Sequence, residues 1–315
     1  MTDTRIIPAD EAGIAAAAAL IARGRPVAVP TETVYGLAGD ATSGAAVAAI
    51  YAAKGRPSFN PLIVHVTSLA MAGEIAVLAP LARRLAARFW PGPLTMVLPI
   101  AQSAPIASLI TAGLPTVAVR MPAHPVMRTL IEAVGRPLAA PSANASGTIS
   151  ATRADHAARS LAGRIKLVLD GGPTSVGIES TIVAVGEDRL RLLRPGSITA
   201  EMLAEAGGVP VETADSGAIE APGQMTSHYA PSKPLRLNAA APAEGEYHIG
   251  FGNVAGDTTL SAAGDLGEAA ARLFDLLHTA DAADTRAIAV APIPATGLGL
   301  AINDRLQRAA APRSI

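Results

Sequence analysis

The segment KGRPSFNPLIVH, residues 54–65, places two cations on a turn rich in glycine and proline, directly before an apolar run that ends in histidine. Glycine and proline oppose a helix, so we expect a loop to present Lys54 and Arg56. The apolar run Leu62–Val66 then predicts a strand that enters the core. An arginine fork suits phosphate oxygens, and a nearby lysine adds a point charge. The segment predicts an anion site, with an ordinary solvated basic turn as the alternative.

Outward from this segment, short apolar runs alternate with helical patterns up to about residue 207, which predicts an α/β domain with a largely buried sheet. Strands are expected at Val27–Val29, Leu62–Val66, Leu94–Leu98, Val117–Val119, Leu138–Ala140, Lys166–Leu169 and Thr181–Val185. Helices are expected over residues 12–22, 44–53, 78–89, 125–134 and 152–161, with Ser43 and Thr152 as caps and Gly24 ending the first.

The rest of the chain divides into a segment without periodicity and a second small α/β unit. Residues 208–233 are rich in Gly, Pro, Ser and Thr, as in a linker. A flexible spacer has little use for Met225, His228 and Tyr229, so we expect this linker to fold over another part of the protein. The second unit has expected strands near Tyr247–Phe251 and Ala287–Ala291, and expected helices from Leu266 to His278 and after Ala301. The predicted domains are therefore 1–207 and 234–315, joined by 208–233.

Composition narrows the classes of function. The net charge of −1 gives no overall attraction to nucleic acid or to an anionic membrane, so anion binding must be local. The absence of Cys excludes disulfides, thiolate nucleophiles and Cys-based zinc sites. The Ala-rich run near the N-terminus follows acidic residues and is too short to span a bilayer. We expect a cytoplasmic protein without a membrane partner.

Two polar loops follow predicted strands, where open α/β sheets usually bind ligands. In PTETVYGL, residues 30–37, Thr31 and Thr33 suit a polar zwitterion and Tyr35 offers a flat wall; the alternative is a loop that caps the next helix. In PSANASG, residues 141–147, small residues let backbone N–H groups approach a phosphate, and Ser142 and Asn144 add short polar groups. An ordinary Ser/Asn turn is the alternative for the second loop.

Two further arginines are candidates for binding anions. Arg120 ends an apolar strand, and an arginine on the buried side needs a carboxylate or phosphate partner. It could instead form a structural ion pair with Glu32 or Glu179. Arg194 is followed by Pro195 and Gly196, which again places an arginine on a rigid turn.

Seven segments in series resemble motifs of the Sua5/YrdC family of threonylcarbamoyl-AMP synthases. They are PTETVYGL (30–37), KGRPSFNPLIVH (54–65), WPGPLT (90–95), TVAVRMP (116–122), APSANASG (140–147), GIESTIV (177–183) and LRPG (193–196). The linker and second unit resemble the long Sua5 form. The resemblance implies a YrdC-like twisted open sheet flanked by helices, followed by a small Rossmann-like Sua5 domain.

The resemblance also implies an activity. Members make L-threonylcarbamoyladenylate from L-threonine, bicarbonate or CO2, and ATP with Mg²⁺, and they release pyrophosphate. The product supplies the t6A modification of tRNAs through downstream transferase components, so tRNA would be an indirect partner.

By motif, the resemblance assigns residues to each substrate. The expected threonine-binding residues are Thr33, His65, Arg120, Ala140 and Ser180, to which the reading of the first polar loop adds Tyr35. The expected ATP-binding residues are Lys54, Arg56, Asn60, Thr116, Ser142, Ser150, Arg194 and Tyr229, to which the reading of the second polar loop adds Asn144. Lys54 and Arg56 would stabilise charge during catalysis, and no protein residue is expected to ligate a metal.

Two other functions are compatible with a YrdC-like unit. A carbamoyl-adenylate-forming domain of the hydrogenase-maturation kind would carry Cys-rich zinc elements, which this chain lacks. The second is an RNA-binding module without adenylate-forming activity. A net charge of −1 argues against it, because RNA binding depends on attraction between cations and phosphates.

Overall fold

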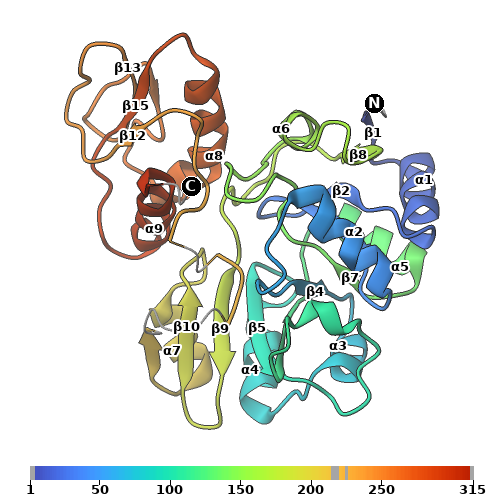
Figure 1. Cartoon of the computed structure of the whole chain (residues 1–315). Helices are drawn as coiled ribbons and strands as arrows, with labels where there is room; N and C mark the ends of the chain where they lie inside the picture. Colours follow the sequence, from blue (N-terminus) through green and yellow to red (C-terminus); the bar gives the residue numbers. More distant parts are fainter. Residues whose placement is uncertain (1–3, 214–219, 224–225, 313–315) are drawn as a thin grey trace.

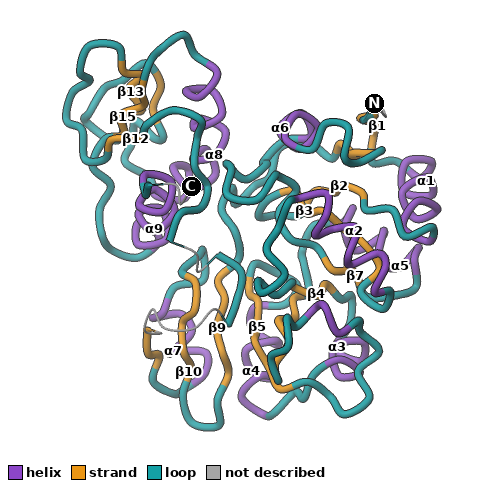
Figure 2. Tube along the Cα trace, viewed as in Figure 1, coloured by secondary structure: helices purple, strands orange, loops and turns teal. Residues whose placement is uncertain are grey.

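Two α/β units make up the computed structural model, which describes residues 4–213, 220–223 and 226–312 (Figures 1 and 2). The described strands of the first unit form a sheet of 11 in the order β1-β8-β2-β3-β7-β4-β6-β5-β9-β10-β11. These strands are β1 (Arg5–Pro8), β2 (Val27–Pro30), β3 (Tyr35–Asp40), β4 (Ile63–His65), β5 (Leu94–Pro99), β6 (Thr116–Arg120), β7 (Leu138–Ala139), β8 (Leu167–Asp170), β9 (Thr181–Val185), β10 (Leu190–Arg194) and β11 (Val211–Thr213).

Helices cover this sheet, and a smaller sheet forms the second unit. The helices of the first unit are α1 (Glu11–Ala22), α2 (Gly44–Lys54), α3 (Leu69–Ile75), α4 (Pro80–Phe89), the short 3-10 helix η1 (Ser108–Ile110), α5 (Pro125–Val134), α6 (Ala154–Ser160) and α7 (Ala200–Gly207). The second unit contains β12 (Leu235–Arg236), β13 (Glu246–Gly250), β14 (Thr258–Thr259), α8 (Leu266–Ala282), β15 (Ala287–Val290) and α9 (Leu298–Ala310). Its strands pair in parallel in the order β12-β15-β13-β14. The predicted α/β fold is confirmed.

Several local expectations differ from the structure. Residues 35–40, expected mainly as loop, form β3, which pairs antiparallel with β2. The Ser43 side chain caps α2 by accepting from Ala46 N, as predicted. Thr152 does not cap α6: the N-cap position is held by Arg153, whose side chain makes no capping bond, and the Thr152 amide donates to His156 Nδ1. β10 and α7 were not predicted. β11 lies inside the predicted linker and pairs with β10, so the first sheet extends beyond residue 207.

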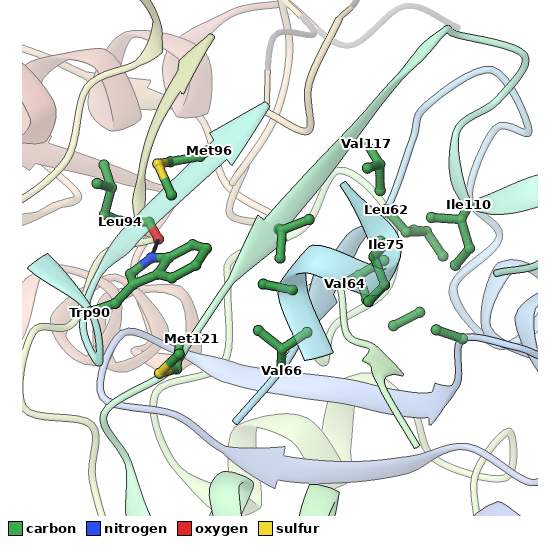
Figure 3. Packing of buried hydrophobic residues seen from close by; sticks show 14 of the residues in the cluster. Leu62, Val64, Val66, Ile75, Trp90, Leu94, Met96, Ile110, Val117 and Met121 are labelled. Atoms are coloured by element: carbon green, nitrogen blue, oxygen red, sulfur yellow. Dashed lines mark hydrogen bonds between the residues drawn. The ribbon is translucent and has the colours of Figure 1, made fainter. Parts of the chain in front are cut away.

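The two faces of the central strands have different neighbours because side chains alternate along a strand. Leu62, Val64 and Val66 point into the main apolar core, together with Val117 and Val119 of the β6 region. In this core, shown in Figure 3, the Trp90 indole packs near Leu94 and its Nε1 donates to Leu94 O at 2.7 Å. The intervening residues, including Ile63 and His65, therefore face the opposite side of the sheet.

The second unit packs directly on the first. Val34, Ile149 and Ile178 of the first unit share an apolar cluster with α8 and α9. The rings of His156 in α6 and His278 in α8 stack with centroids 3.9 Å apart. The contact is close, since a Cβ on Gly177 would lie 2.4 Å from the α8 backbone. Figure 1 shows this unit, coloured orange to red, beside α6 and the ends of β9 and β10.

Candidate ligand site

A cavity lies on the sheet face opposite the main core. Its floor includes Ile63 and His65 of β4, and its cover includes Pro222, Gly223 and Tyr229 of the linker. The open space has a volume of about 40 Å³, so the linker nearly fills it. The sequence-predicted residues that line this cavity are Thr33, Arg56, His65, Arg120, Ala140, Ser142, Ser180, Arg194 and Tyr229.

One end of the cavity is built around Arg120, at the end of β6 and in register with His65. Arg120 Nη1 donates to Thr33 Oγ1 at 2.9 Å, and Nη2 pairs with Glu32 Oε1 at 2.8 Å. The expected alternative of an ion pair with Glu32 is therefore present. Burial, followed by Arg120, lowers the pKa of His65 to about 3, so His65 is neutral at pH 7. The result is a polar end with one fixed guanidinium and a neutral imidazole.

The other end contains two buried guanidinium groups, those of Arg56 and Arg194. Arg56 donates to the Asn60 side chain at 2.5 Å and to Pro61 O at 2.8 Å. Arg194 donates to Ser180 O at 3.0 Å, to Ser180 Oγ at 3.1 Å and to Pro222 O at 3.3 Å. Within the described part of the chain, neither forms an ion pair with a carboxylate. Two such cations define a site for an anion.

The protonation of these groups reflects their burial. Burial lowers the pKa of Arg56 to about 10, and the nearby charge of Arg194 contributes. Burial also lowers the pKa of Arg194. Arg56 remains a cation at neutral pH. A bound anion would relieve the repulsion between the two guanidinium groups.

The small-residue loop after β7 forms one wall and is held from behind by Lys54. The Lys54 ammonium donates to Ser142 O at 2.5 Å and to Asn144 O at 2.6 Å. Burial, with Arg56 second, holds the pKa of Lys54 well below its usual value. The predicted phosphate contact of Lys54 therefore stays a prediction, because in this structure its donors hold the loop.

Some predicted residues do not line the cavity. Tyr35 is a correction: its ring is buried in the main core and its hydroxyl donates to Gly172 O at 2.7 Å, so it forms no cavity wall. Asn60 lies behind Arg56, and Ser150 donates to Glu179 Oε1 at 2.5 Å. Thr116 stands at the opposite end of β6 from Arg120. Asn144 also lies outside the lining, as does Lys54.

The linker covers the cavity as predicted. Tyr229 is 1% exposed and has a positive φ of 63°, and its ring packs edge-on against His228. Ala230 pairs with Thr148 as an isolated bridge, and His228 N donates to Arg308 O at 3.1 Å. Met225, the third residue of this prediction, lies outside the described residues. The linker therefore contacts both units above the cavity.

Sequence reasoning missed several lining residues. Ile63 could have been found from strand alternation, since it shares a face with His65. Pro222 and Gly223 carried no local signal, because their contact with Arg194 joins segments far apart in the chain. Glu179, which was considered only as a partner of Arg120, lines the cavity and pairs instead with Arg305 of α9.

Folded stability should decrease on acidification from pH 7 to 5. Burial lowers the pKa of both His65 and His156 to about 3, whereas an unfolded histidine titrates near 6.5. Between these values the unfolded chain binds more protons, so the unfolding free energy falls as pH falls. Each histidine should cost about 2 kcal/mol at pH 5.

Urea unfolding at the two pH values measures this loss. His156→Gln is the matched variant because His156 lies outside the cavity. Between pH 7 and 5 this variant should lose less unfolding free energy than the unmodified protein. Equal losses in the two proteins would contradict the assignment.

Fold and site together define an α/β protein with a polar cavity that contains two buried arginines and lies under a linker between two domains. A family model described as telomere recombination, Sua5_yciO_yrdC, matches residues 19–196. A second, described as threonylcarbamoyl-AMP synthase, C-terminal domain, matches residues 198–311. The chain belongs to the Sua5/YrdC family and has the two-domain organisation of the long Sua5 form.

Similar proteins cover the chain almost completely. A threonylcarbamoyl-AMP synthase of Bacillus subtilis is 43% identical, covering 96% of this chain and 94% of that protein. One from Pyrococcus abyssi is 40% identical, covering 97% and 96%. The crystal structure of P. abyssi Sua5 complexed with L-threonine superposes with a TM-score of 0.88 at 38% identity, covering 98% of each chain.

Proposed function

We propose that this protein is a threonylcarbamoyl-AMP synthase, which joins L-threonine, bicarbonate or CO2, and ATP into threonylcarbamoyl-AMP and pyrophosphate. The observation that carries the proposal is the pair of buried guanidinium groups, Arg56 and Arg194, in one cavity with Arg120, Thr33 and His65. The pair Arg56 and Arg194 suits a phosphate group. The other three side chains suit an amino acid. Both substrates must meet in one enclosed space for this reaction.

The polar end binds threonine in this proposal. Arg120, fixed by Glu32, binds the threonine carboxylate. The carboxylate accepts from Nη1, either alongside Thr33 Oγ1 or in its place. His65, being neutral, adds no competing charge near the amine. The Ser180 hydroxyl, held by Thr95 Oγ1 at 2.8 Å, supplies a further polar contact.

The arginine end binds the triphosphate, and a small apolar surface suits the adenine. Ile63, Val97, Ala118 and Ile182 form an apolar cluster on the cavity side of the sheet, covered by Ala221 of the linker. The linker must move for ATP to enter, since the cavity of about 40 Å³ is too small for it. Tyr229 then closes over the bound nucleotide.

The reaction requires no protein nucleophile. The unprotonated threonine amine attacks CO2, forming an N–C bond and releasing a proton, to give the carbamate. A carbamate oxygen then attacks the α-phosphorus of ATP, and the bond to pyrophosphate breaks. Positioning supplies up to roughly 7–11 kcal/mol in favourable cases, and Arg56 and Arg194 stabilise the charge on the phosphates.

Mg²⁺ enters the proposal as the ion carried by ATP, where it would neutralise phosphate charge. In the described ranges, no group of three or more His, Cys, Asp or Glu side chains could hold a metal ion.

The product would pass to the transferase components that make t6A, and tRNA would be an indirect partner. We propose the cytoplasm as the location of this role. In the part of the chain that the structure describes, no helix is both long and apolar enough to cross a membrane. The RNA-binding alternative is not favoured, because a net charge of −1 gives no overall attraction to nucleic acid.

A direct assay tests the proposal. The protein is incubated with ATP, Mg²⁺ and bicarbonate, with or without L-threonine, and both pyrophosphate and threonylcarbamoyl-AMP are measured. Both products should form only when threonine is present. Pyrophosphate release that does not depend on threonine would reject the proposal, and L-serine serves as a matched substrate control.

A further inference from the structure

Arg305 of α9 is fully buried, although it carries a charge and belongs to the second unit. It does not line the cavity. Figure 1 shows α9, in dark red, next to the region where β9 begins and β10 ends. These strand ends carry Ser180 and Arg194, which do line the cavity.

The Arg305 guanidinium binds two separate segments of the first unit. Its Nε pairs with Glu179 Oε2 at 3.1 Å, and Nη2 donates to Glu179 O at 3.3 Å. Its Nη1 donates to Pro195 O at 2.6 Å and to Asp304 Oδ2 at 3.0 Å. It also lies 5.7 Å from the centre of the Tyr229 ring. One side chain therefore contacts both strand ends and the linker.

These contacts are one residue away from Ser180 and Arg194, and Glu179 itself lines the cavity. Glu179 precedes Ser180, and Pro195 follows Arg194. The two segments are pressed together, since a Cβ on Gly196 would lie 2.5 Å from Thr181 N. The second Glu179 oxygen accepts from Ser150 Oγ. A shift of Glu179 or Pro195 would move Ser180 and Arg194 with it.

Neighbouring groups stabilise the positive charge of Arg305. Burial disfavours the cation, but Tyr229, Glu179 and Asp304 more than offset burial, so the pKa of Arg305 lies above its usual value. The planar guanidinium donates in several fixed directions, whereas a lysine ammonium has one centre. A lysine could replace the charge here but could not reproduce the fixed set of bonds that the guanidinium makes to Glu179 and Pro195.

We propose that Arg305 is a positioning residue through which the second unit sets the spacing of Ser180 and Arg194, and hence the affinity for both substrates. This role rests on the proposed synthase activity. It gives the second unit a direct part in the geometry of the site.

Steady-state kinetics of Arg305→Met and Arg305→Lys test the inference, with unfolding midpoints measured in parallel. Arg305→Met should raise the KM for both threonine and ATP about tenfold, as expected for losing charge-assisted hydrogen bonds. Arg305→Lys keeps the buried charge, so it should still fold, and it should still show both raised KM values. Arg272→Met is the matched control, because Arg272 is a partly exposed α8 arginine paired with Glu268. It should leave both KM values unchanged.

Unchanged KM values in Arg305→Lys would overturn the inference, because charge alone would then be sufficient. If Arg305→Met does not fold, Arg305→Lys decides the question by itself. The unmodified protein is assayed in the same series. If it forms no threonine-dependent product, the proposed function is rejected. If it forms product with the same KM values as the Arg305 variants, only the positioning role is rejected.

Discussion

Arg56→Ala should reduce threonine-dependent pyrophosphate release by about 100- to 1000-fold, the usual effect of removing a group that stabilises transition-state charge. Arg56 is one of the two buried guanidinium groups that face the cavity without an ion-paired carboxylate in the described ranges. Its loss leaves Arg194 as the remaining cavity cation at that end. The fold should persist, with about 1–3 kcal/mol lost because Asn60 and Pro61 lose a donor.

Two further variants make this result specific. Arg56→Lys keeps the charge but loses the fork, so it should recover only part of the activity. Arg189→Ala removes an exposed arginine paired with Asp188 and should behave like the unmodified protein. Full activity in Arg56→Ala would show that the segment at residues 54–65 is a basic turn without a role in catalysis.

Arg120→Met should raise the KM for threonine by at least about 100-fold, because it removes the proposed carboxylate partner. It should also cost about 3–5 kcal/mol of stability, because Glu32 is left buried without its partner. Burial alone would raise the pKa of Glu32, and Arg120 holds it below its usual value. Chemical unfolding and threonine titration measure the two effects.

The double variant Glu32→Gln with Arg120→Met separates stability from binding. A neutral pair replaces the buried ion pair, so much of the lost stability should return. Threonine use should remain impaired, because no guanidinium is restored. If the double variant used threonine normally, Arg120 would be a structural ion-pair partner and not a ligand-binding group.

The sequence predicted the elements with strong local patterns. The apolar runs Leu62–Val66 and Thr181–Val185 identified central strands, because a strand between two packed layers must carry apolar residues on both faces. The sequence did not reveal β10 or β11, whose pairing joins the end of the first unit to the predicted linker. Strand order was also beyond reach, since mixed parallel and antiparallel pairing depends on long connections.

The same division applies to the site. Motifs predicted Thr33, Arg56, His65, Arg120 and Arg194, which line one cavity, because their chemistry is local to short segments. Tyr35 was assigned wrongly to the cavity, because its loop is in fact the start of β3 and its ring turns into the core. The direction of a side chain depends on how its strand pairs with a distant strand, and a local motif does not reveal that pairing.

By itself, the sequence determined which charged and polar groups are available for an anion and an amino acid, and that a linker connects two α/β units. Only the tertiary structure decided that Lys54 holds a backbone loop, that the linker fills the cavity, and that Arg305 reaches Glu179 across 126 residues of sequence. The reason is physical. Residue type and periodicity act over a few neighbours, whereas buried charges find partners through packing of whole units.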